Sequence, residues 1–282
     1  MSFLKKLSSK PVIGPIAERV GKVVVNHKAN QIARHFAQFL KPVVAYNSFL
    51  RDEAFKIRHN VYCEELAFEE CREDKRETDE ADAHSIICLI QHRSTQKYAG
   101  TCRVVYSRSE EQLLPLERYC SEFIDDPELH PSKFARNKIC EISRLAVPAS
   151  FRRRASDKHK GAATGAINEN TYSESELRCF PFIAVGLYLC AASVVISKEI
   201  DHCYVMMEPR LARSLSFLGI KFKQIGPVVD YHGRRAPYYI SPEMLLNSLT
   251  PGFKRLFSSI KGELENEVFE DESGLVVISS ID

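Results

Sequence analysis

The chain has 282 residues, 44% of them hydrophobic, so it can bury a substantial core in one large domain or two small ones. Its formal net charge of +2 argues against a general nucleic-acid binder, which is usually more basic. The nine cysteines are odd in number and include no CxxC pair. That pattern is typical of reduced thiols in a cytoplasmic protein, and not of a disulfide framework or a zinc site.

Residues 1–41 are expected to form a helical extension. Lysines near the start are typical of a signal peptide, but the prolines, glycine and charges that follow interrupt any apolar stretch. From about Pro15 to Leu40 the sequence predicts a helix, because Ile32, Phe36 and Leu40 recur one turn apart. Its other face is basic, which leaves two interpretations: a helix packed on the domain, or a surface that contacts a membrane or an acidic partner.

Residues 42–250 are expected to form the main domain, with strands and helices in mixed order. The predicted elements, in chain order, are a strand at Pro42–Tyr46, a helix at Arg51–Leu66, strands at Ser85–Gln91 and Tyr98–Tyr106, a helix at Leu114–Ile124, a strand at Ile139–Val147, a helix at Pro181–Ile200, a strand at His202–Met207, a helix at Glu208–Leu218, strands at Lys221–Val229 and Ala236–Ile240, and a helix that Ser241 caps and that runs through Leu249. This order fits a mixed α/β sheet with helices on both faces. It lacks the strict alternation of a doubly wound fold, and no GxGxxG or Walker loop appears.

Three segments stand apart from this pattern. The polar residues 148–178 predict a long inserted loop, because a connection of that length is usually functional or disordered. The uncharged run from Phe180 to Ile196 falls just short of a membrane span, so we expect a buried core helix. Residues 251–282 are expected to form a C-terminal tail with an acidic cluster, Glu263–Glu272.

The strand Ile139–Val147 carries two opposite charges, Glu141 and Arg144, three residues apart. A regular strand sends residues i and i+3 to opposite faces. The two residues therefore serve different neighbours, or the strand is kinked between them. A charge within an apolar strand costs free energy unless it has a partner. The arginines Arg58, Arg103 and Arg144 and the carboxylates Asp79, Asp82 and Glu141 could neutralise one another in a desolvated cleft.

This ordered set resembles the pattern of the acyl-homoserine-lactone synthases and the related long-chain N-acyl amino acid synthases. That pattern is Arg-x3-aromatic, a second aromatic six residues later, Asp-x2-Asp, a Gly-x2-Arg strand and Glu-x2-Arg in the next strand. Here it is filled by Arg58, Tyr62, Phe68, Asp79, Asp82, Gly100, Arg103, Glu141 and Arg144. The later motifs Glu208-Pro209-Arg210-Leu211 and Tyr231-His232-Gly233-Arg234-Arg235 are similar to acyltransferases of the exosortase protein-sorting system.

All these families belong to the Gcn5-related N-acetyltransferase superfamily, so the resemblance implies that fold, with a splayed central sheet. It also implies amide formation from a thioester and a primary amine. The pantetheine arm would lie where the central strand separates from His202–Met207, and backbone N–H groups of Leu145–Val147 would bind it and the developing oxyanion. Glu141 would be the base, directly or through a water. The alternative makes Glu141 a structural salt-bridge partner of Arg103.

The remaining site residues are assigned to substrates. Arg58, Arg103 and Arg144 could grip an acceptor carboxylate, unless Asp79 and Asp82 already occupy them. Tyr62 and Phe68 would line the site with them, and Tyr204 and Tyr188 are candidate proton donors to the leaving thiolate. The apolar helix would wall an acyl tunnel with Phe182, Val185 and Leu189, or form plain core. Asp79, Asp82 and His84 also permit a metal-site interpretation, but we expect no metal.

The superfamily's usual Gln/Arg-x-x-Gly-x-Gly/Ala pyrophosphate loop is absent after the central strand. This favours an acyl carrier protein over acyl-CoA as the donor, although acyl-CoA stays open. The cluster Arg152, Arg153 and Arg154 could meet the acidic carrier, or be a solvated charge run.

The sequence thus predicts a cytoplasmic N-acyltransferase without a cofactor, which transfers a long fatty acyl chain from acyl carrier protein to an amino acid. The alternatives are a synthase of acyl-homoserine-lactone signals and a non-catalytic acyl-carrier or lipid-binding module.

Overall fold

The computed structural model describes residues 32–152, 182–231 and 233–266, together with a short pair formed by β9 (Phe269–Glu270) and β10 (Val276–Val277). The strands of the main sheet are β1 (Leu40–Val44), β2 (Ser85–His92), β3 (Tyr98–Tyr106), β4 (Ile139–Ala146), β5 (His202–Met207), β6 (Lys223–Gln224), β7 (Val229–Asp230) and β8 (Arg234–Ile240). The α-helices are α3 (Ser48–His59), α4 (Pro115–Cys120), α5 (Ala149–Arg152), α7 (Ile183–Ser197), α8 (Pro209–Ser216), α9 (Pro242–Ser248) and α10 (Pro251–Glu265). Shorter turns are the π-helix η1 (Asn60–Glu65) and the 3₁₀ turns η2 (Glu80–His84), η3 (Ser121–Phe123), η4 (Pro131–Lys133) and η5 (Arg136–Lys138).

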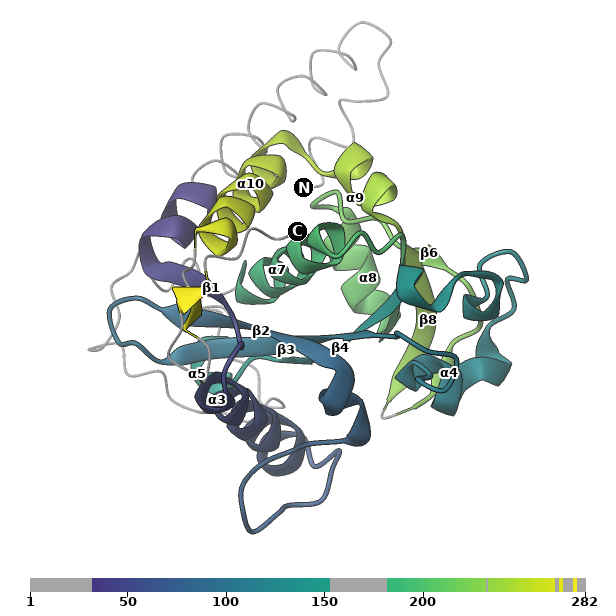
Figure 1. Ribbon diagram of the computed structural model, residues 1–282, viewed down its shortest axis with the longest axis horizontal. Coiled ribbons are helices and arrows are strands. Elements are labelled where there is room, and N and C mark those ends of the chain that lie inside the picture. Colours follow the sequence, from purple (N-terminus) through teal and green to yellow (C-terminus); the bar gives the residue numbers. More distant parts are fainter. Residues whose placement is uncertain (1–31, 153–181, 232, 267–268, 271–275, 278–282) are drawn as a thin grey trace, which may run out of the picture.

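One mixed sheet of eight strands forms the centre of the molecule. Its order is β1-β2-β3-β4-β5-β8-β6, and β7 pairs with β8. Helix α3 lies on one face, while α7, α9 and α10 lie on the other (Figure 1). Residues 32–39 are also helical and lead directly into β1. The mixed α/β fold with helices on both faces is therefore confirmed.

Most predicted elements are present with shifted ends. Strands β3 and β5 have the predicted bounds. The helix expected from Arg51 begins three residues earlier, because the Asn47 side chain accepts a hydrogen bond of 2.9 Å from the Leu50 amide and caps it. The single strand expected over Lys221–Val229 is wrong. It is divided into β6 and β7, because Gly226 and Pro227 interrupt the ladder between them.

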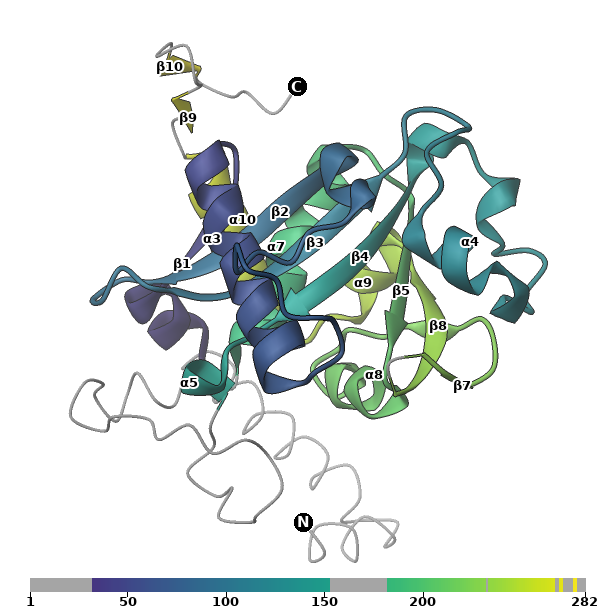
Figure 2. The same ribbon diagram turned by 90° about the horizontal axis from the view of Figure 1, so that it is seen from below.

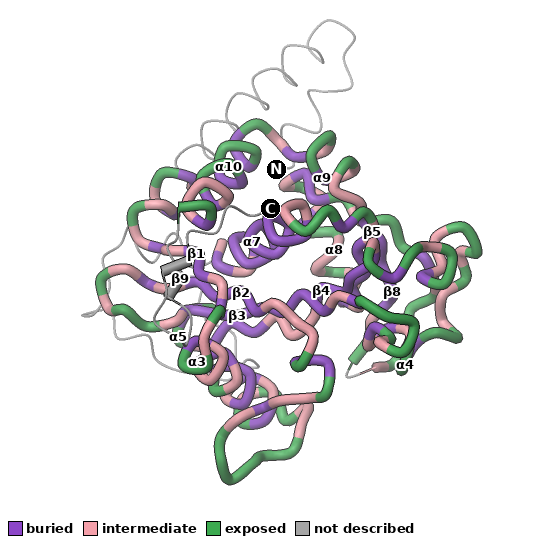
Figure 3. Tube along the Cα trace, viewed as in Figure 1, coloured by how far each residue is buried: buried purple, intermediate pink, exposed green. Residues whose placement is uncertain are grey.

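Helix α7 is the centre of the apolar core. Nearly all of its residues from Ile183 to Val195 are buried, so it has no polar face (Figure 3). It packs against β2 and β3 and is covered by α10. A helix that is apolar on all sides needs such complete burial. No helix in the described part of the chain is both long enough and apolar enough to cross a membrane.

The prediction of a tail from residue 251 is wrong over α10. This helix buries one stripe of apolar residues against α7 and β1. The stripe consists of Phe253, Leu256, Phe257, Ile260 and Leu264. Its spacing of three and four residues is a helical signal. The charged residues between the stripe positions made the segment resemble a solvated tail.

Replacing Leu256 with alanine is expected to reduce the free energy of unfolding by about 2–5 kcal/mol, because the side chain is fully buried and would leave a cavity. The matched control is Leu246→Ala on α9, where the leucine is 40% exposed. That change should cost less than about 0.5 kcal/mol. Urea denaturation measures both, and equal small losses would mean that α10 contributes little to the core.

Strands β4 and β5 are hydrogen-bonded only at their beginnings. Their parallel ladder joins Ile139–Glu141 to His202–Tyr204 and ends there. Beyond this point β4 continues along β3, and β5 continues along β8 (Figure 2). The edges of β4 and β5 that face each other therefore lack a strand partner over Ile142–Ala146 and Val205–Met207. The splayed central sheet is confirmed.

Strand β4 is kinked beside this gap. On β3 the step from Thr101 to Arg103 is two residues, whereas on β4 the partners Ala146 and Ser143 are three residues apart. The extra residue is a β-bulge, and Arg144 adopts a positive φ of 52° there. Both interpretations of the charged strand are correct, because the strand is kinked and Glu141 and Arg144 also have different partners. The bulge allows Glu141 and Arg144 to line the same cavity.

Candidate active site

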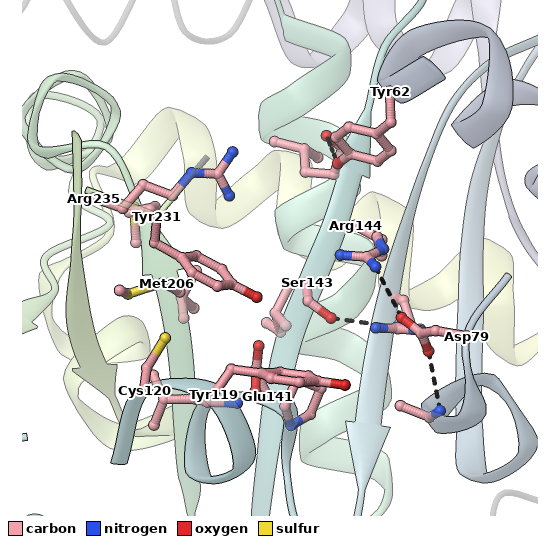
Figure 4. A pocket seen from close by; sticks show the side chains of 18 of the residues that line it. Tyr62, Asp79, Tyr119, Cys120, Glu141, Ser143, Arg144, Met206, Tyr231 and Arg235 are labelled. Atoms are coloured by element: carbon pink, nitrogen blue, oxygen red, sulfur yellow. Dashed lines mark hydrogen bonds and ion pairs between the residues drawn. The ribbon is translucent and has the colours of Figure 1, made fainter. Parts of the chain in front are cut away.

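A cavity of ≈ 730 Å³ occupies the gap between β4 and β5 (Figure 4). Its volume falls within the usual range for small-molecule sites. One wall is β4 from Glu141 to Leu145, and the opposite wall includes Val205–Met207 of β5 and Arg235 of β8. Further walls come from η1, the charged loop before η2, α4 and Tyr188 of α7.

A buried network of ion pairs supports the β4 side of this cavity. Arg58 is fully buried, and its guanidinium contacts Glu77 at 2.5 Å and Asp82 at 2.7 Å. Arg103 contacts Asp79 at 2.5 Å and Asp82 at 2.9 Å. Burial raises the pKa of Asp82, but the hydrogen bond and charge of Arg58 outweigh burial and lower it to about 2.

Glu77 is the third carboxylate of this network, and the sequence analysis missed it. It is 1% exposed and contacts both Arg58 and, at 3.2 Å, Arg144. Arg144 also contacts Asp79 at 3.0 Å. Three arginines and three carboxylates do neutralise one another, but Glu77 takes the place expected of Glu141. Nothing local marks Glu77, because it is one of many charged residues between Glu69 and Asp82.

Glu141 has no ion-pair partner among the described residues. It is 3% exposed, and one oxygen accepts a hydrogen bond of 2.6 Å from the Leu116 amide. Burial raises the pKa of Glu141 to about 7, against the opposing effects of that hydrogen bond and the charges of Arg103 and Arg144. The alternative salt bridge to Arg103 is wrong, because that guanidinium is bound by Asp79, Asp82 and Ser143. A carboxylate that exchanges its proton near neutral pH is suited to general-base chemistry.

Two predicted aromatic residues line the cavity. The Tyr62 hydroxyl donates a 2.7 Å hydrogen bond to the Leu145 carbonyl, and the Arg144 guanidinium lies 5.9 Å from the Tyr62 ring centroid. Phe68 lies under Arg235, also at 5.9 Å. Tyr62 belongs to the π-helix η1, a conformation that is frequent at functional sites.

Other predicted site residues do not line the cavity in the described structure. These are Arg58, Asp82, Val147, Phe182 and Tyr204. Arg58 and Asp82 belong to the supporting network. Phe182 packs against Phe253, with ring centroids 6.4 Å apart. Val147 is buried in the core.

The two tyrosines considered as proton donors differ in position. The Tyr204 hydroxyl donates a 2.9 Å hydrogen bond to the Leu129 carbonyl, away from the cavity. Tyr188 is the cavity residue that α7 contributes, and burial raises its pKa. Val185 and Leu189 lie in the core instead of on the cavity wall. Most of α7 therefore serves as core.

The basic cluster and the metal-site interpretation have separate outcomes. Arg152 forms an ion pair with Glu65, while Arg153 and Arg154 lie outside the described residues, as does most of the expected loop 148–178. Asp79 and Asp82 are bound by arginines. Within the described ranges, no group of histidine, cysteine and acidic side chains could hold a metal ion.

Comparisons with known proteins agree with this architecture. A family model described as an acetyltransferase (GNAT) domain matches residues 57–160. The CoA-dependent acyl-homoserine lactone synthase BjaI, solved with SAM and isopentyl-CoA, aligns with a TM-score of 0.50 at 15% identity and covers 77% of this chain and 89% of its own. The acyl-homoserine lactone synthase LasI (TM-score 0.49, 15% identity, 74% and 96% covered) and the N-acyl amino acid synthase FeeM from uncultured soil microbes (0.49, 15%, 74% and 94%) are also similar. No curated protein sequence matches.

The match of residues 57–160 to an acetyltransferase (GNAT) domain supports an acyltransferase. The chain also has the fold of the acyl-homoserine lactone synthase BjaI.

Proposed function

We propose that this acyltransferase joins a long fatty acyl chain, carried as a thioester on acyl carrier protein, to the amine of an amino acid. The observation that carries the proposal is Glu141, a buried carboxylate with a pKa of about 7 that lines the cavity between the diverging strands. An amine must lose a proton to form an amide, and a base with a pKa near the working pH accepts it well.

The proposed reaction is one acyl transfer. The amine nitrogen attacks the thioester carbon, and its proton passes to Glu141. Unpaired backbone N–H groups along the facing edges of β4 and β5 stabilise the tetrahedral oxyanion. The carbon–sulfur bond then breaks, and the thiolate receives the proton that Glu141 holds. Tyr188, which lines the cavity and stays protonated, supplies a hydrogen bond to the departing sulfur.

The donor is proposed to be acyl carrier protein because the sequence lacks the superfamily's usual pyrophosphate loop after β4. BjaI is CoA-dependent, so the shared fold is compatible with either donor. The cysteines of the described residues are free thiols, which supports our inference of a cytoplasmic location.

The decisive experiment offers the protein matched donors and acceptors. Acyl carrier protein and CoA, each loaded with a palmitoyl chain, are incubated with the amino acids and S-adenosylmethionine, and products are identified by mass spectrometry. We expect an acyl amino acid, formed faster from the carrier protein. Formation of an acyl-homoserine lactone would mean that the acceptor is that of a signal synthase and not an amino acid. A retained acyl chain without product would indicate a lipid-binding module.

Replacing Arg152, Arg153 and Arg154 together with alanine is expected to lower kcat/KM for the carrier-protein donor about tenfold, because the variant loses electrostatic steering toward an acidic partner. A small pantetheine thioester should react normally. The control is Arg152→Ala alone, which breaks only the exposed ion pair with Glu65. Equal losses with both donors would contradict a docking role for the cluster.

A further inference from the structure

One arginine of the cavity, Arg235, has a side chain with neither an ion pair nor a hydrogen bond to another described residue. Arg235 lies on β8, in register with Val229 of β7, and its side chain lines the cavity. Its Nε is buried and has no hydrogen-bond partner. The guanidinium instead lies over the Phe68 ring. Arg235 itself is half-buried, but a buried donor without a partner is costly, so this arrangement calls for a ligand.

The other arginines of the cavity already form ion pairs or hydrogen bonds within the chain. Arg103 and Arg144 are bound within the network of Glu77, Asp79 and Asp82, although Nη2 of Arg103 is also buried without a hydrogen-bond partner. Arg118 is paired with Glu80, and Arg72 donates hydrogen bonds to Thr78. The sequence left two possibilities for Arg58, Arg103 and Arg144: they hold the acceptor carboxylate, or carboxylates of the chain occupy them. The structure shows the second.

The position of Arg235 suits a substrate that spans the gap. Arg235 and Tyr231 stand on the β8 side, facing Glu141, Ser143 and Arg144 across the cavity (Figure 4). The charge of Arg235 also acts on two tyrosines in the other walls of the cavity. Burial raises the pKa of Tyr62 and of Tyr188, and the Arg235 charge acts in the opposite direction on both.

We infer that Arg235 binds an anionic oxygen group of a substrate, through the charged, forked hydrogen bonds that a guanidinium makes to such groups. Within the proposed function, on which this inference rests, two groups carry that chemistry. They are the carboxylate of the acceptor amino acid and the phosphate of the donor's phosphopantetheine. Either would satisfy the buried Nε and leave the reacting end directed toward Glu141.

The test compares Arg235→Gln with Arg234→Gln, the neighbouring exposed arginine of the same strand, which does not line the cavity. The acceptor arm pairs an amino acid with its carboxamide, and the donor arm pairs acyl-phosphopantetheine with acyl-pantetheine. In one arm, Arg235→Gln should lower kcat/KM about 10- to 100-fold for the anionic compound only. Loss in the acceptor arm identifies the carboxylate, and loss in the donor arm identifies the phosphate. If Arg235→Gln still prefers the anionic compound in both arms, as wild type does, the inference is overturned.

A binding measurement separates this inference from the proposed reaction. Thermal unfolding is followed with each anionic compound and its neutral analogue. Wild type and Arg234→Gln should be stabilised by the anionic compound, whereas Arg235→Gln should not. If wild type makes no amide but shows this difference, the proposed function fails and the anion site stands. Equal stabilisation of Arg235→Gln, or none in wild type, overturns the site. Arg235→Lys, which keeps the charge without the fork, should show partial stabilisation and guards against a folding defect.

Discussion

Replacing Glu141 with glutamine is expected to lower kcat about 10²- to 10⁴-fold, the usual contribution of a general base. The amide has almost the same shape as the carboxylate, and its oxygen can keep the hydrogen bond from the Leu116 amide. The loss should therefore come from proton transfer and not from misfolding. Single-turnover rates with a saturating thioester donor measure it. A normal rate would remove Glu141 from the mechanism.

The pH dependence of the wild-type enzyme gives an independent test. Glu141 has a folded pKa of about 7, above its ordinary value of 4.5, so the folded protein holds this proton more tightly than the unfolded chain does. The resulting stabilisation is complete below pH 4.5 and is lost as the pH rises to 7. It amounts to about 3 kcal/mol at about 1.4 kcal/mol for each pH unit. Over the upper part of this window the turnover rate should rise, because the base becomes free to accept a proton.

Glu141→Gln should remove both the pH dependence of stability and the pH dependence of the turnover rate. At about pH 8 the variant should be more stable than wild type, because it no longer buries a charged carboxylate. The control is Glu122→Gln, the same chemical change at an exposed residue outside the cavity. It should leave the rate and both pH profiles unchanged. A Glu141→Gln variant that is strongly destabilised but retains the wild-type rate would show that Glu141 has a structural role instead.

Replacing Glu77 with alanine is expected to reduce the free energy of unfolding by about 3–5 kcal/mol, because removal of one member of a buried ion pair leaves the other charge uncompensated. Arg58 is fully buried and depends on Glu77 for one of its two carboxylate contacts. Arg144 would lose a partner as well. Urea denaturation at neutral pH measures the loss.

The control for this change is Glu80→Ala, three residues later at the first residue of η2. Glu80 is paired with Arg118 at the surface, so its removal should cost less than about 1 kcal/mol. The double variant Glu77→Ala, Arg58→Met should lose less than the sum of the two single changes, because their effects share one interaction. Additive losses would show that the two side chains are not coupled.

Local patterns in the sequence were sufficient for much of the fold. Strands β3 and β5 are short runs rich in apolar residues, and α7 is apolar over four turns. Each element can therefore be recognised from its own residues. The family motif also brought Arg103, Glu141 and Arg144 to one cavity correctly. These predictions succeeded because backbone geometry fixes which neighbouring residues share a face.

Only the tertiary structure decided how the charges are paired. Glu77 comes from a charged loop without a regular pattern, yet it pairs with Arg58 and Arg144. Asp79 and Asp82 occupy Arg103, so Glu141 has no ion pair among the described residues. The bulge at Arg144 depends on the register between β3 and β4, and the isolation of Arg235 depends on where β8 meets the gap. Pairings of this kind join residues far apart in the chain, and their energies depend on burial. Residue order determined the elements and the motif, whereas desolvation in the folded chain determined which carboxylate could act as a base.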